Sequence, residues 1–76
     1  MVIYNNFMSK IKLYTFSTTK KQYFYINQKV KDIQTGQEGI IYNISSNLSN
    51  EIIIKVSYIH FRKGYPSNQQ IYLETI

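Results

Sequence analysis

Residues 30–44 decide the fold of this chain and read VKDIQTGQEGIIYNI. Gly36 and Gly39 stand three positions apart between two β-type runs, a pattern that predicts a tight reversal between antiparallel strands. At least one of these turn glycines is expected at a positive φ, where a Cβ is strained. A further β-type run, IIIKVSYI at residues 52–59, follows shortly after. The centre of the chain is therefore predicted to be consecutive antiparallel strands.

The domain organisation follows from these runs. We expect an all-β fold, with a small antiparallel barrel of about five strands over residues 28–76. Residues 1–27 form an N-terminal extension in this interpretation. At 76 residues the chain has room for one domain, and its stability is expected to be marginal.

Residue alternation predicts which side chains form the core. In the run at residues 52–59, Ile54, Val56 and Tyr58 share one face and are expected to point inward. In the run before it, a β-bulge would let both Ile41 and Ile44 enter the core. Residues 45–50 are expected to be an exposed hairpin loop, and residues 66–70 a single helical turn before a short last strand.

The N-terminal extension allows more than one interpretation. Alternation over residues 11–14 and the aromatic residues 23–26 predict two short strands joined near residues 17–20. A targeting peptide is the alternative, because the stretch is acid-poor and hydroxyl-rich, although it contains no arginine and no clear helical spacing. Met8 is an alternative start, which would make the residues before it a flexible tail.

The formal net charge of +5 is unevenly distributed. Residues 27–76 carry five cations and four acids, a balance of only +1. Residues 1–26 carry four lysines and no acid, a balance of +4. Any electrostatic footprint for nucleic acid or for an anionic membrane is therefore expected on the extension. Its lysines are Lys10, Lys12, Lys20 and Lys21.

The composition limits the cellular compartments in which we expect the protein. The chain has no cysteine, so it can form neither a disulfide framework nor a thiolate metal site. No secretory leader is expected, because the N-terminus lacks a basic region followed by an apolar one, and no apolar run is long enough to span a bilayer. We expect a soluble or peripheral protein of the cytoplasm or of an organelle matrix or stroma, not a secreted one. The abundance of Ile, Tyr, Asn and Lys is the bias of an AT-rich genome, so part of the basic charge reflects codon usage.

The inventory of reactive side chains argues against an enzyme. His60 is the single histidine, no thiol is present, and the four acids are scattered without a pair spaced for acid–base work. No Gly-x-Ser-x-Gly turn is present. We expect no catalytic residue, no cofactor and no metal ligand.

The best candidate for a partner-binding surface is the run HFRKGYP at residues 60–66. It combines aromatic and cationic side chains in a Gly/Pro-bounded loop, a composition typical of interface anchors or of stacking on exposed bases. The alternative is a solvated loop in which an aromatic ring covers the barrel end. Tyr42, Tyr58 and Tyr72 are expected to pack in the barrel. The predicted partner-binding residues are His60, Phe61, Arg62, Lys63 and Tyr65.

Residues 28–76 resemble an SH3-like small barrel, and the Gly-x-x-Gly reversal resembles the KOW-type turn of ribosomal and transcription-factor barrels. The ending YLETI at residues 72–76 is also similar to small SH3-like accessory subunits such as the variable subunit of ferredoxin-thioredoxin reductase. The chain departs from the KOW pattern at Gln34 and Gln37, where a basic residue would favour RNA.

Two functions follow from the residues and the resemblance. The favoured one is a non-catalytic accessory or adaptor subunit that docks on a larger protein assembly. The alternative is a KOW-like barrel that binds RNA or DNA, for which the basic extension and the Arg62–Lys63 pair argue.

Overall fold

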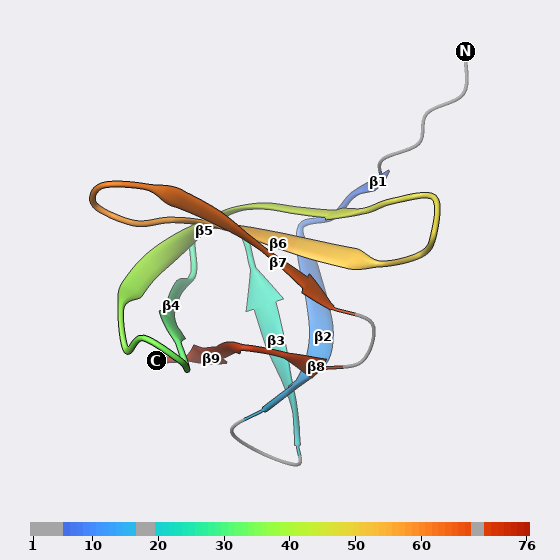
Figure 1. Cartoon of the computed structure of the whole chain (residues 1–76). Helices are drawn as coiled ribbons and strands as arrows, with labels where there is room; N and C mark the ends of the chain where they lie inside the picture. The colour runs from blue at the N-terminus through green and yellow to red at the C-terminus, as the bar shows by residue number, and fades with distance from the viewer. Residues whose placement is uncertain (1–5, 17–19, 68–69) are drawn as a thin grey trace.

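The computed structural model describes residues 6–16, 20–67 and 70–76, and within them it contains strands and no helix (Figure 1). The all-β prediction is therefore confirmed. The strands form two sheets, and neither sheet closes on itself in the described residues. The elements are β1 (Asn6–Phe7), β2 (Lys10–Thr15), β3 (Lys21–Tyr25), β4 (Lys29–Asp32), β5 (Glu38–Ser46), β6 (Ile52–Ser57), β7 (Arg62–Ser67), β8 (Gln70–Ile71) and β9 (Leu73–Thr75).

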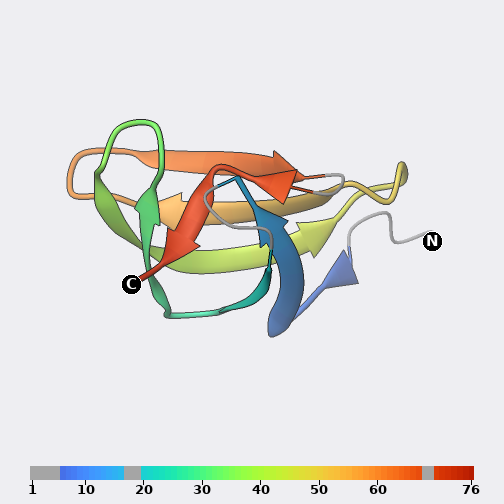
Figure 2. The ribbon, with the colours of Figure 1, turned by 90° about the horizontal axis from the view of Figure 1, so that it is seen from below.

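The first sheet has the order β7-β6-β5-β4-β9, and β1 pairs with the far end of β5. The second sheet has the order β3-β2-β8, in which β2 is antiparallel to β3 and parallel to β8. In Figure 1 the long strands β5, β6 and β7 form the upper layer, and β2 and β3 run down from it at a steep angle; Figure 2 shows the same layers from below. The two sheets adjoin where β3 lies beside β9 and β7 beside β8.

The reversal between β4 and β5 is built as the glycines predict. Gly36 has a φ of +77°, and its N–H donates to the carbonyl oxygen of Asp32 over 2.8 Å. Gly39 serves a different purpose, because a Cβ there would lie 2.7 Å from a methyl carbon of Val56 and 2.8 Å from the Ser57 carbonyl oxygen. The first glycine is needed for its backbone conformation and the second for close packing of β5 on β6.

The predicted core is largely confirmed. Ile54, Val56 and Tyr58 are buried, and a register shift between Ile41 and Asn43 in β5 lets both Ile41 and Ile44 point inward. Bulges of this kind place one extra residue on one strand, which resets the side-chain alternation.

The extension contributes directly to this core. The two predicted strands are present as β2 and β3, and Leu13 and Phe24 lie in the same buried cluster as Val30, Ile54 and Leu73. Ile11 packs against this cluster from the same hairpin. Residues 1–5 and 17–19, which include most of the predicted junction at residues 17–20, lie outside the described residues.

Two local predictions are wrong. Ser45 belongs to β5 and pairs with Ile53 of β6, so the hairpin loop begins later than expected. The predicted helical turn is replaced by the end of β7, where Pro66 also pairs with Ile53 and Ser67 is buried. Proline is tolerated there because β7 is an edge strand, on which a missing N–H need not break a ladder bond. Asn68 and Gln69 lie outside the described residues.

Candidate functional site

Lysine and tyrosine side chains face one another across the two strands on the outer face of the β2–β3 hairpin. Every second residue of each strand is exposed, and the cross-strand register sets Lys10 opposite Tyr25, Lys12 opposite Tyr23, and Tyr14 opposite Lys21. Each pair on this side therefore joins one cation to one aromatic ring. We call these six residues the lysine–tyrosine face: Lys10, Lys12, Tyr14, Lys21, Tyr23 and Tyr25.

The cations lie over the rings. The Nζ atoms of Lys10 and Lys12 are 5.4 Å and 5.1 Å from the centroid of the Tyr23 ring, and Lys21 Nζ is 5.2 Å from that of Tyr14. Such cation–π contacts contribute about 0.5–1 kcal/mol at exposed sites. They arrange the charges but are weak enough for a ligand to displace. The rings stay accessible, since Tyr23 is 52 % and Tyr25 50 % exposed.

The strands β2, β3 and β8 contain no acidic side chain that would compensate the charge of the three lysines. Asp32 is buried at the end of β4, Glu38 pairs with Lys29 over 3.3 Å, and Glu51 accepts a hydrogen bond from Asn47. The fourth acid, Glu74, lies on β9 in the first sheet. The structure therefore presents three of the four lysines of the extension on one positive, aromatic face.

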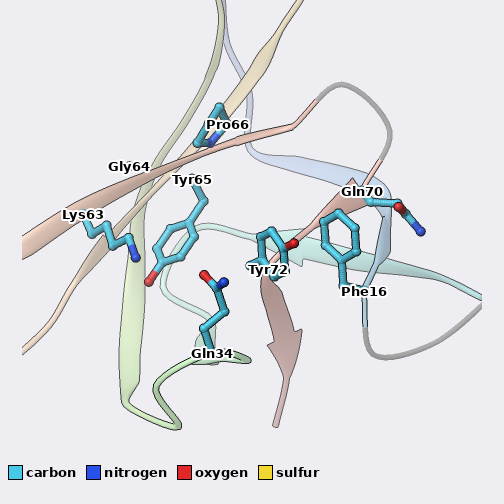
Figure 3. Close-up of a pocket in the computed structure, with 8 residues that line it drawn as sticks. All are labelled: Phe16, Gln34, Lys63, Gly64, Tyr65, Pro66, Gln70 and Tyr72. Atoms are coloured by element: carbon cyan, nitrogen blue, oxygen red, sulfur yellow. The ribbon is translucent and has the colours of Figure 1, made fainter.

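A groove lies at the end of this face (Figure 3). Phe16, directly after β2, stacks on Tyr72 with ring centroids 4.0 Å apart and an interplanar angle of 15°, and both rings are nearly half exposed. Gln70 of β8 is opposite Tyr14 in the parallel register, so it joins the groove to the face. The groove encloses about 350 Å³ and is lined by Phe16, Gln34, Lys63, Gly64, Tyr65, Pro66, Gln70 and Tyr72.

A buried polar chain supports one wall of the groove. The Tyr65 hydroxyl donates to Asp32 Oδ2 over 2.5 Å and also bonds the Tyr58 hydroxyl, while Lys63 Nζ lies 3.4 Å from the same carboxylate oxygen. The other carboxylate oxygen accepts the N–H groups of Gln34 and Thr35 at 2.8 Å and 3.0 Å. One carboxylate thus joins the β4–β5 reversal to β7.

The ionisation states of Asp32, Tyr65 and Tyr58 favour a structural role for these buried side chains. Burial raises the pKa of Asp32, but the hydrogen bonds from Tyr65 and from the backbone, together with Lys63, outweigh it, so the pKa lies below its usual value. Burial, with the hydrogen bond to Asp32, raises the pKa of Tyr65 well above that of a free tyrosine. Burial also raises the pKa of Tyr58. At neutral pH the carboxylate is charged and both phenols are neutral donors, an arrangement that contains no activated nucleophile.

The structure divides the predicted partner-binding residues among several surroundings. Tyr65 is buried against Asp32, and Lys63 forms an ion pair with the same residue. Arg62 lies over the ring of Tyr42, with its guanidinium carbon 4.8 Å from the ring centroid. His60 and Phe61 precede β7 and are exposed. These residues do not share one face, because successive side chains of a strand point to opposite sides.

A second groove of about 340 Å³ lies at the β6–β7 connection and includes His60 and Phe61. The Phe61 ring stacks on Tyr58 with centroids 4.8 Å apart, so it covers one end of the core as the alternative interpretation expects. Ile59 beside it is 91 % exposed. The remaining lining residues are Gln37 and Glu38.

Sequence reasoning missed the main feature. The extension is recognisably basic from its sequence, but the pairing of its tyrosines with its lysines was not predicted, although Lys12, Tyr14, Tyr23 and Tyr25 occupy alternate positions of the two predicted strands. Tyr42 and Tyr72 were expected to pack inside, yet they are 38 % and 42 % exposed. Only Tyr58 of the three is buried.

In the described part of the chain, no three His, Asp or Glu side chains gather as they would around a metal ion. The same residues include no helix long and apolar enough to cross a membrane. Comparison with protein-family models, with curated proteins and with solved structures found no match to this chain.

Proposed function

We propose that this protein is a non-catalytic module that binds single-stranded nucleic acid on the lysine–tyrosine face. The observation that carries the proposal is the cross-strand pairing of a lysine with a tyrosine at three successive positions of the exposed hairpin face. Proteins that bind single strands combine cations that follow the phosphates with aromatic rings on which the bases stack.

The interaction energies favour replacement of a lysine by a base over a tyrosine ring when a single strand binds. Stacking of a base on an aromatic ring is worth about 1–3 kcal/mol, more than the ~0.5–1 kcal/mol of an exposed cation–π contact. A base can therefore take the place of an ammonium over Tyr23 or Tyr14, and the released lysine is then free to meet a phosphate. The exposed residues of β2, from Lys10 to Tyr14, lie in a row of roughly 13 Å, from the rise of a strand. A duplex fits this face less well, because its bases are already stacked on one another.

The strand arrangement supports an SH3-like small barrel as the scaffold. Strands β4 to β7 form an antiparallel meander, and β9 pairs with β4 on the side away from β5. The second sheet fills the space between the edges, because β3 lies beside β9 and β8 beside β7. Gln22 of β3 accepts hydrogen bonds from the N–H and the hydroxyl of Thr75 over 3.2 Å each.

The proposal is tested by fluorescence anisotropy with labelled oligothymidine and with a duplex of equal length. We expect the single strand to bind more tightly. Tyr23→Ala should weaken binding by roughly fivefold or more, from the loss of one stacking platform. Tyr42→Ala is the matched control, since Tyr42 is also a partly exposed strand tyrosine with a cation over its ring, but lies on β5. Equal effects of the two variants, or equal binding of the duplex, would contradict the proposal.

A second candidate is the accessory or adaptor subunit, for which the β6–β7 connection argues. Ile59 is almost fully exposed and adjoins Phe61, and such apolar pairs beside a groove anchor protein partners. This surface is separate in the sequence and in the fold from the lysine–tyrosine face. Ile59→Ser should abolish capture of a protein partner while leaving oligothymidine affinity unchanged.

A further inference from the structure

We propose that the groove bounded by Phe16, Tyr65 and Tyr72 takes one nucleobase of the bound strand and recognises its edge. This inference rests on the proposed function and adds a specificity subsite to it. The other bases stack on exposed rings, which accept any base, whereas the groove lines its occupant with side chains from several elements.

The position of the groove makes it the continuation of the lysine–tyrosine face. Phe16 is the next residue after Tyr14 on the exposed side of the chain, and its ring stacks on Tyr72. Gln70 lies opposite Tyr14 in the β2–β8 register and also lines the groove. A strand that leaves Tyr14 therefore meets the groove as its next stacking position.

The size of the groove suits a single base. Its volume of about 350 Å³ lies at the lower end of the ~300–1,000 Å³ typical of small-molecule sites. Figure 3 shows the rings of Tyr65 and Tyr72 on two sides of it, with Gln34 below and Pro66 above. Aromatic walls of this kind offer a base one stacking surface and one apolar contact.

The polar groups of the groove fit a base edge rather than a phosphate. The charge of Lys63 is compensated by Asp32, so the groove itself is close to neutral. Gln34 lies between the rings of Tyr65 and Tyr72, and among the described residues its side-chain amide has no hydrogen-bond partner, whereas the Gln70 side chain points away from Tyr65 (Figure 3). A glutamine amide offers both a donor and an acceptor, the combination that base edges present. The phosphates remain on the lysines of the neighbouring face.

The test is a scan of abasic positions combined with point variants. Homo-oligomers of deoxythymidine, deoxycytidine and deoxyadenosine are shortened to the minimal length that retains full affinity, so that the strand has no spare register. Single abasic sites are then placed along the tightest binder. At the position that enters the groove, the abasic site should weaken binding to the parent protein by roughly five- to 150-fold.

The variants assign that position to the groove. In Tyr72→Leu the same abasic site should weaken binding by less than about twofold, because the missing base has no partner left to lose. Gln34→Ala should reduce the penalty in part, and it tests the inference even if Tyr72→Leu fails to fold, since the Gln34 side chain is exposed. Tyr23→Ala should leave the penalty at this position unchanged and remove one at another position.

The experiment distinguishes failure of the proposed function from failure of this inference alone. If the parent protein binds none of the oligomers, the proposed function itself is wrong. If the oligomers bind and every abasic penalty persists in both Tyr72→Leu and Gln34→Ala, the face binds nucleic acid and the groove holds no base, which overturns this inference alone.

Discussion

The Tyr65 hydroxyl donates a 2.5 Å hydrogen bond to Oδ2 of Asp32, from the edge strand β7 to the last residue of β4. The same carboxylate accepts two backbone N–H groups of the β4–β5 reversal, which fixes the turn that carries Gln34. A single buried charge therefore helps to position two lining residues of the groove, Tyr65 and Gln34.

Asp32→Asn should destabilise the protein by about 1.5–3 kcal/mol at pH 7, because a hydrogen-bonded charge is replaced by an amide whose NH₂ group faces other donors. Because the pKa of Asp32 is lowered in the folded protein, its contribution is present above the unfolded-state pKa, and it disappears as the pH falls through the folded-state value. Urea unfolding of the parent should therefore show a loss of stability from about pH 5 downward, and the variant should show a smaller one. Glu38→Gln, which removes an exposed ion-paired acid, is the control and should keep the steeper pH dependence of the parent.

The two turn glycines should respond differently to alanine. Gly36→Ala should cost about 1 kcal/mol, from the positive φ alone, because nothing lies near its added Cβ. Gly39→Ala should cost more, about 1–3 kcal/mol, because the new Cβ meets the backbone of Ser57. Thermal melting separates them by several degrees, at roughly 4–8 °C per kcal/mol for this size. Gly64→Ala, whose Cβ would make an ordinary contact, should melt like the parent; an equal loss at all three positions would contradict the assignment.

Substitutions of two neighbouring residues of β3 should distinguish an effect on folding from an effect on binding. Phe24 is fully buried, so Phe24→Ala should cost about 3–5 kcal/mol and leave little folded protein. Tyr25 is half exposed, and Tyr25→Ala should change the free energy of unfolding by less than about 1 kcal/mol while weakening oligothymidine binding. Circular dichroism and anisotropy measure the two effects. A stable Phe24→Ala protein would show that the β2–β3 hairpin is not part of the core.

The salt dependence of oligothymidine binding should report the lysines of the face. With three phosphate contacts, the logarithm of the association constant should fall with the logarithm of salt concentration at a slope near −2, from about 0.7 per contact in single strands. Lys12→Ala should make the slope shallower by about 0.7. Lys55→Ala removes an equal charge from an exposed position on β6 and should leave the slope unchanged. A slope altered equally by both variants would indicate a general charge effect rather than a site.

Several elements of the fold were predictable because they depend on local backbone geometry. The period of two places Ile54 and Val56 on one face whatever the rest of the chain does, and Gly36 marks a conformation that other residues avoid. The excess charge of the extension is likewise a property of composition. Assigning residues 62–65 to a strand instead of a loop would also have predicted that Arg62 and Lys63 point to opposite sides.

The sequence by itself determined the all-β class, the β4–β5 turn and the inward residues of the central strands, because each follows from a short-range pattern. Only the tertiary structure decided the register that pairs Lys12 with Tyr23, the stacking of Phe16 on Tyr72, and the groove beside that stack. The stack and the groove join segments far apart in the chain, and their geometry depends on how two sheets pack around one core. No local period encodes that packing, so the candidate site became visible only when the strands were placed side by side.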